Sequence, residues 1–94
     1  MPTATALVST DRPQRYIKQL VSHFGAKVDS ELTDDGGSLR FPFGTSVLTA
    51  TDAGIEIRAE ADSAEDLERL QDVVARHLVR FGSKDELAVD WASV

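Results

Sequence analysis

The sequence contains no cysteine, which excludes disulfides, thiolate metal sites and cysteine nucleophiles together. This composition fits a reducing compartment, so the cytoplasm is the expected location. Long apolar runs are also missing, since none approaches the roughly 20 residues of a membrane-spanning helix. The first six residues have neither the basic start nor the apolar stretch of a secretory signal. We therefore expect no membrane segment.

Positive charge is scarce, with 10 Lys and Arg against 16 Asp and Glu and a formal net charge of -6. Six of these basic residues are scattered over two predicted helices: Arg12, Arg15, Lys18, Arg69, Arg76 and Arg80. The average field of such a protein repels phosphate backbones, so we expect no nucleic-acid partner.

The length of 94 residues indicates a single domain, 1–94, with an ordinary balance of 41% apolar and 28% charged residues. A chain of this size buries roughly 65% of its unfolded surface, so it folds alone with little margin. Both a monomer and a homodimer are compatible with this composition.

Catalytic and cofactor-binding motifs are missing as well. Gly36-Gly37 has none of the glycine spacing of a phosphate-binding loop, and Gly44–Leu48 lacks the second glycine of a nucleophile elbow. The acidic run 60–68 does not match a calcium-binding loop. No cofactor is therefore indicated by a motif.

Two amphipathic helices are predicted. The first begins near Asp11, expected as the N-cap with Gln14 completing a capping box, and ends at Gly25. Its apolar stripe consists of Tyr16, Ile17, Leu20, Val21 and Phe24. The second helix is capped by Ser63 and ends at Gly82. Its stripe consists of Leu67, Leu70, Val74, Leu78 and Phe81.

Alternating patterns predict the strands, at residues 3–9, 27–33, 39–43, 46–51, 55–60 and 86–91, with turns at 34–37 and 52–54. Pro42 requires its strand to bend, to lie at an edge or to end there. Four consecutive strands with short turns require an antiparallel meander, and two one-sided helices must cover its apolar face. The predicted fold is an α+β two-layer sandwich with a curved antiparallel sheet, in the order β-α-β-β-β-β-α-(β).

The only two histidines, His23 and His77, lie near the ends of the two predicted helices. If the helices pack side by side on the sheet, the two imidazoles approach each other. One interpretation is a metal- or haem-ligand pair or a proton-linked switch, with Glu86 as the carboxylate that could join it. The other is that both are partly buried structural residues at helix ends, where carbonyl groups favour positive charge.

The aromatic residues also have two interpretations. Most of them are expected in the core of a small domain. Alternatively, a pocket opens near Phe41 and Phe43, with Tyr16 or Trp91 supplying a polar group.

Four blocks, 15–24, 39–44, 67–81 and 86–91, occur in order across nearly the whole chain and resemble the bacterial family called domain of unknown function 2218. Members occur alone or beside siderophore-interacting flavoproteins, so the resemblance implies a link with iron acquisition and such a flavoprotein as partner. Ser22 stands where the family pattern has a small residue or cysteine. The order of elements also resembles the TATA-binding-protein-like arrangement, although a fold alone does not carry function.

We therefore expect an uncharacterised cytoplasmic domain that acts as a non-catalytic binding or interaction module, auxiliary to iron–siderophore metabolism. The alternative is a metal- or haem-binding protein that uses the two histidines. A third hypothesis is an enzyme with an acid–base histidine, which requires a cleft where a histidine and a carboxylate converge.

Overall fold

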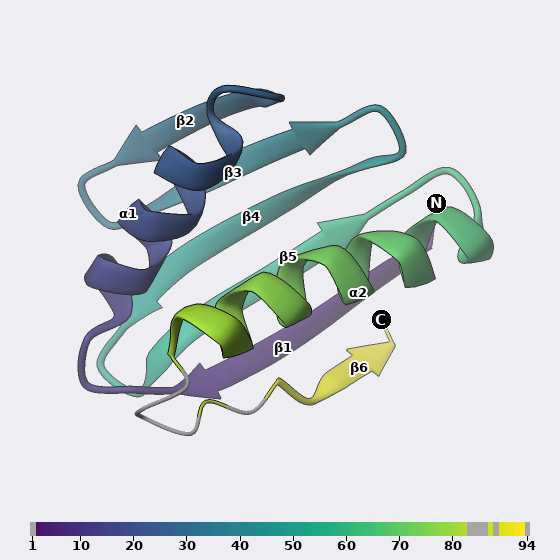
Figure 1. The fold of residues 1–94 in the computed structure, drawn as a ribbon. Coiled ribbons are helices and arrows are strands. Elements are labelled where there is room, and N and C mark those ends of the chain that lie inside the picture. The colour runs from purple at the N-terminus through teal and green to yellow at the C-terminus, as the bar shows by residue number, and fades with distance from the viewer. Residues whose placement is uncertain (1, 83–86, 88, 94) are drawn as a thin grey trace.

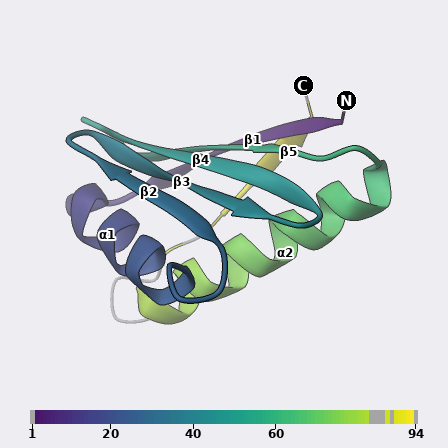
Figure 2. The same cartoon turned by 90° about the horizontal axis from the view of Figure 1, so that it is seen from above.

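A computed structural model describes residues 2–82, 87 and 89–93. In this part of the chain six strands form one twisted antiparallel sheet, and both helices lie on the same face of it (Figures 1 and 2). The elements are β1 (Thr3–Ser9), α1 (Pro13–Phe24), β2 (Asp29–Thr33), β3 (Gly36–Phe41), β4 (Gly44–Thr51), β5 (Gly54–Glu60), α2 (Ala64–Phe81) and β6 (Trp91–Ser93). The predicted two-layer α+β fold and its order of elements are confirmed.

The strands lie in the order β2-β3-β4-β5-β1-β6, so β1 is inserted between two strands that come much later in the sequence. Ala6 of β1 stands opposite Ile57 of β5 on one side and Trp91 of β6 on the other. Alternate residues of β1 face the helices and are buried, whereas Leu7 between them is 53% exposed on the other face. The sheet therefore has one face under the helices and one face without a described helix.

Helix α1 buries the predicted stripe of Tyr16, Ile17, Leu20, Val21 and Phe24 against the sheet. Its start differs from the prediction. Arg12 is the N-cap and makes no side-chain capping bond, and Pro13 occupies the first turn. Gln14 does not close a capping box, because its Nε2 donates to the carbonyl oxygen of Asp34 at 3.1 Å. The predicted Asp11 cap is therefore wrong, whereas the end of the helix at Gly25 is confirmed.

Helix α2 begins as predicted. The Oγ of Ser63 accepts a hydrogen bond from the backbone N–H of Asp66 at 3.1 Å, and Glu65 and Asp66 lie in the positively polarised first turn. Leu70, Val74 and Leu78 are fully buried under the helix. The helix ends at Phe81, with Gly82 as its C-cap.

The glycine pair Gly36-Gly37 was predicted in a turn, but both residues belong to β3, and the turn is formed by Asp34 and Asp35. Gly37 lies where α1 crosses the sheet, and a side chain there would collide with the helix. The prediction for Pro42, at the next hairpin, is confirmed. Strand β3 ends at Phe41, and Pro42 lies in the turn before β4.

The last strand lies later than predicted. Residues 87, 89 and 90 of the predicted 86–91 segment are not in a strand, and β6 begins at Trp91. Leu87, with 6% exposure, is nevertheless buried in the core. The apolar alternation in this segment therefore reflects the burial of Leu87 in the core, because residues 87, 89 and 90 do not pair in the sheet.

Leu39, Leu48, Ile55 and Ile57 fill the centre of the core between sheet and helices. One polar residue lies among these apolar side chains. Ser46 points into the core from β4 and is 0% exposed. Its Oγ makes no hydrogen bond within the described part of the chain. The core row of Leu39, Ser46 and Ala59 across three strands thus contains one buried hydroxyl.

Candidate functional site

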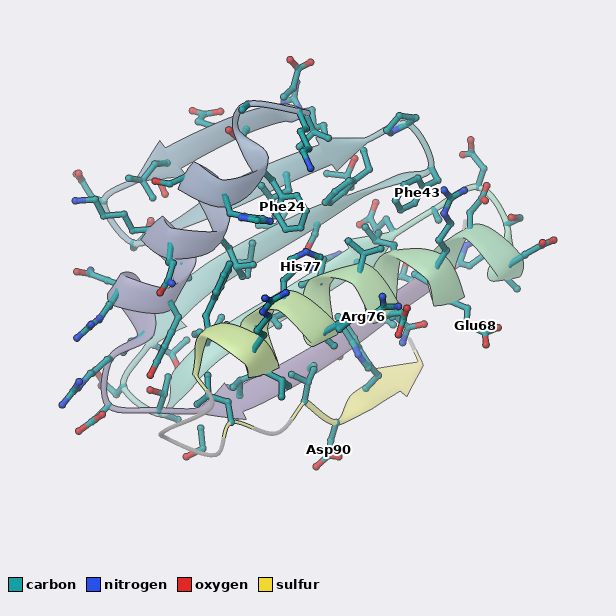
Figure 3. All side chains as sticks on the ribbon, viewed as in Figure 1. Phe24, Phe43, Glu68, Arg76, His77 and Asp90 are labelled. Atoms are coloured by element: carbon teal, nitrogen blue, oxygen red, sulfur yellow. The ribbon has the colours of Figure 1, made fainter. Side chains whose placement is uncertain are left out.

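The C-terminal end of α1 and the second half of α2 meet on the sheet, and this junction gathers most of the aromatic rings. Figure 3 shows His77 extending from α2 toward Phe24 of α1. Their ring centres lie 4.7 Å apart, in an edge-to-face arrangement. Such pairs stabilise the contact by roughly 0.5–1.5 kcal/mol beyond the area that they bury.

The two histidines come together at this junction. Their ring centres lie 5.1 Å apart, with an angle of 44° between the ring planes. His77 is half-buried between the helices, whereas His23 is exposed. Only one member of the pair is therefore shielded, and the other faces solvent.

One nitrogen of His77 has a defined partner. Its Nδ1 lies 2.7 Å from the carbonyl oxygen of Val73, one turn earlier in α2. A carbonyl oxygen only accepts hydrogen bonds, so Nδ1 must carry the proton. In the neutral imidazole the lone pair then resides on Nε2, which is the arrangement of a histidine prepared to bind a ligand through that atom.

The histidines continue into a row of phenylalanine rings. Phe24 contacts Phe41 at 5.2 Å between ring centres, and Phe41 stacks on Phe43 at the same distance. Phe81 lies 5.5 Å from His23. We call this set the histidine–phenylalanine strip: His23, Phe24, Phe41, Phe43, His77 and Phe81.

The strip is partly open to solvent. Phe24 is buried in the core, but Phe41, Phe43 and Phe81 are only half-buried. At the far end the guanidinium carbon of Arg69 lies 4.5 Å above the centre of the Phe43 ring. A cation over an aromatic face at an exposed position contributes about 0.5–1 kcal/mol. The strip thus has imidazoles at one end and a fixed positive charge at the other.

The four residues predicted to line a pocket do not all lie together. Phe41 and Phe43 stack within the strip. Trp91 lies on β6, with β1, β5 and β4 between it and Phe41 on β3. Tyr16 lies in α1 eight residues before Phe24, and its side chain is buried in the core with 6% exposure. Only Phe41 and Phe43 therefore belong to the strip.

Glu86, the carboxylate predicted to join the histidines, lies outside the described residues. Within residues 2–82, 87 and 89–93 no group of three or more His, Cys, Asp and Glu residues is arranged to hold a metal ion. A metal site made of described residues is thus limited to the two imidazoles.

A separate hollow of about 120 Å³ lies between α1 and the β2–β3 hairpin, lined by Ile17, Leu32, Gly36, Gln14 and Lys18 among others. It is small compared with the roughly 300–1,000 Å³ of ordinary ligand pockets. No residue pattern predicted this hollow, one of whose lining residues, Gln14, bonds through Nε2 to the carbonyl oxygen of Asp34 in the hairpin.

The strip contains residues whose role was missed at the level of sequence. Phe24 and Phe81 were assigned to apolar stripes, but the contacts of Phe24 with His77 and of Phe81 with His23 depend on how the helices cross. The bond from His77 to Val73 has a weak sequence signal, the spacing of four residues along a helix. No helix in the described part of the chain is long and apolar enough to cross a membrane.

Comparison with known proteins identifies a matching family and a similar solved structure. A family model described as an uncharacterized protein conserved in bacteria (DUF2218) matches residues 5–92. The NMR structure of PA4090 from Pseudomonas aeruginosa is 29% identical and has a TM-score of 0.83, with 98% of this chain and 96% of that chain covered. Among curated proteins no match is found.

Proposed function

The chain belongs to the DUF2218 family of uncharacterized bacterial proteins, and from that premise we propose that it is a non-catalytic binding domain whose ligand rests on the histidine–phenylalanine strip. The observation that carries the proposal is the partly open row of rings that ends in a solvent-facing imidazole at His23. Aromatic surface combined with a few polar atoms is typical of small-ligand sites.

The hydrogen bonding of His77 supports binding rather than acid–base catalysis. Its Nδ1–H is directed at the carbonyl oxygen of Val73. In acid–base enzymes the corresponding N–H is often directed at a carboxylate, which stabilises the protonated ring. The neutral carbonyl of Val73 orients the imidazole and leaves the lone pair on Nε2, where a ligand can bind.

The family context supports the class of ligand. The family resemblance seen in the sequence implies a place beside siderophore-interacting flavoproteins, and several siderophores chelate iron through catechol rings. A flat catechol stacks on phenylalanine, and its anionic oxygens are attracted by a cation such as Arg69. The proposal therefore includes a cytoplasmic role beside iron–siderophore metabolism, with a siderophore-interacting flavoprotein as partner.

A second candidate function, metal or haem binding, uses the same two histidines. It is favoured by the 5.1 Å between their ring centres. This candidate involves the histidine end of the strip, opposite the Arg69 end to which the catechol oxygens are attracted.

Titration with a dihydroxybenzoate, the aromatic unit of a catecholate siderophore, tests the proposal. We expect shifts of backbone amide resonances in 15N-labelled protein at the strip residues. Phe81→Ala should weaken binding about two- to twelvefold, as loss of one ring contact of 0.5–1.5 kcal/mol implies. The matched control is Leu7→Ala, which truncates an exposed apolar side chain on the face of the sheet without helices. Shifts elsewhere, or equal weakening by both variants, would refute the site.

A further inference from the structure

We infer that His23 and His77 form an exchangeable two-imidazole site for a divalent transition-metal ion, bound through Nε2 of His77 with its remaining positions open. This inference rests on the proposed function, because it specifies the ligand class at one end of the strip. It commits to a metal ion rather than haem.

The separation of the rings matches two imidazoles that share one ion side by side. A metal–nitrogen distance of about 2.0–2.1 Å places the ion roughly 3.2 Å from each ring centre. For an angle of about 90–110° between the two bonds, the ring centres lie about 4.5–5.2 Å apart. The observed distance of 5.1 Å falls within this range.

Haem with both histidines as axial ligands requires a different geometry. The two imidazoles then lie on opposite sides of the iron, with ring centres roughly 6.4 Å apart and the porphyrin between them. The distance of 5.1 Å is too short for this arrangement, and the ring of Phe24 lies 4.7 Å from His77. The pair therefore fits adjacent positions on one ion.

The hydrogen bond of His77 selects the ligand atom. With Nδ1–H held by Val73 at 2.7 Å, the ring is fixed in orientation and its lone pair is on Nε2. Loss of an outer hydrogen bond of this kind typically costs 10–100-fold in metal affinity.

The coordination positions that the two histidines leave open determine how readily the ion exchanges. In the part of the chain that the structure describes, no third His, Cys, Asp or Glu completes the set. Two neutral imidazoles suit copper, nickel, cobalt and zinc, whereas hard magnesium prefers oxygen. Water or the oxygens of a chelating ligand take the other positions, so the ion exchanges readily and serves as the contact through which a chelator binds.

The test uses full-length protein without a histidine tag, titrated with Ni²⁺ by calorimetry. We expect one equivalent per chain, and tighter binding of Ni²⁺ than of Co²⁺, as the stability order of these ions requires. His77→Ala and His23→Ala should each weaken binding by about tenfold or more, and the double variant should abolish it. Mg²⁺ should not bind.

Control variants separate ligand loss from damage to the fold. His77→Gln keeps an amide N–H for Val73 and covers the case in which His77→Ala unfolds. Ser22→Ala and Arg80→Ala change exposed neighbours of the two histidines and should leave Ni²⁺ binding unchanged. In 15N spectra of the imidazoles, diamagnetic Zn²⁺ should shift Nε2 of His77 while Nδ1 remains protonated.

The outcomes distinguish this inference from the broader proposal. Metal binding that survives in the double variant, or ligation through Nδ1 of His77, would overturn the inference. So would failure of Ni²⁺ and Zn²⁺ to bind folded protein. If metal fails but dihydroxybenzoate still binds at the strip, the proposed function stands and only the metal site is wrong. Failure of both probes refutes both.

Discussion

Gly37 of β3 lies directly beneath Val21 of α1. A β-carbon at position 37 would stand 2.7 Å from Cγ2 of Val21 and 3.3 Å from Cγ2 of Ile17. At its C-terminal end the same helix places His23 and Phe24 against His77 of α2.

Gly37→Ala is expected to lower the free energy of unfolding by about 1–3 kcal/mol, because the methyl group over-packs the contact between helix and sheet. Urea denaturation measures the loss. Ser38→Ala, the next residue of the strand on the opposite face, is the control and should change stability by less than about 0.5 kcal/mol. Equal effects of the two substitutions would contradict the close approach of α1.

Ser63→Ala is expected to destabilise the protein by about 1 kcal/mol, since the Oγ of Ser63 is the capping acceptor of α2. The matched variant is Asp11→Ala. Asp11 caps nothing, and its contact with Arg12 at 3.9 Å joins two exposed groups. Thermal unfolding should therefore separate the two variants. A larger loss for Asp11→Ala would restore the capping role that the sequence suggested.

Ser46→Ala is expected to stabilise the protein by about 0.5–1 kcal/mol, because a buried hydroxyl without a partner carries an uncompensated desolvation cost. Ser30 stands in the same row of the sheet, opposite Leu39, but is exposed on the edge strand. Ser30→Ala should leave the urea midpoint unchanged. Destabilisation by Ser46→Ala would mean that the hydroxyl is hydrogen-bonded in solution.

The fold was largely predictable because periodicity and burial agree in this chain. The stripe from Tyr16 to Phe24 and the alternation from Ile55 to Ala59 both face the core. The errors lie where a short-range signal competes with tertiary contact. Asp11 looks like a cap, but Arg12 is the N-cap of α1 and makes no side-chain capping bond. Gly36-Gly37 looks like a turn, but these glycines make room in a strand.

The site was less predictable for a physical reason. The sequence places His23 and His77 near helix ends, but their separation depends on how α1 and α2 cross on the sheet. That geometry depends on residues far from both, including Gly37. The stacking of Phe41 on Phe43 across Pro42 was likewise set by the turn between β3 and β4, not by the alternation that placed both rings on one face.

The position of β1 has a consequence for how the domain assembles. Its hydrogen-bonding partners are β5 and β6, so Ala4 pairs with Ala59 and with Ser93. These contacts join residues that are far apart in the sequence, so a large loop must close before they stabilise the fold. The entropy cost of closing that loop slows folding to milliseconds or longer. During synthesis the nascent β1 therefore has no partner until β5 has left the ribosome, and its exposed edge needs protection from misassociation in that interval.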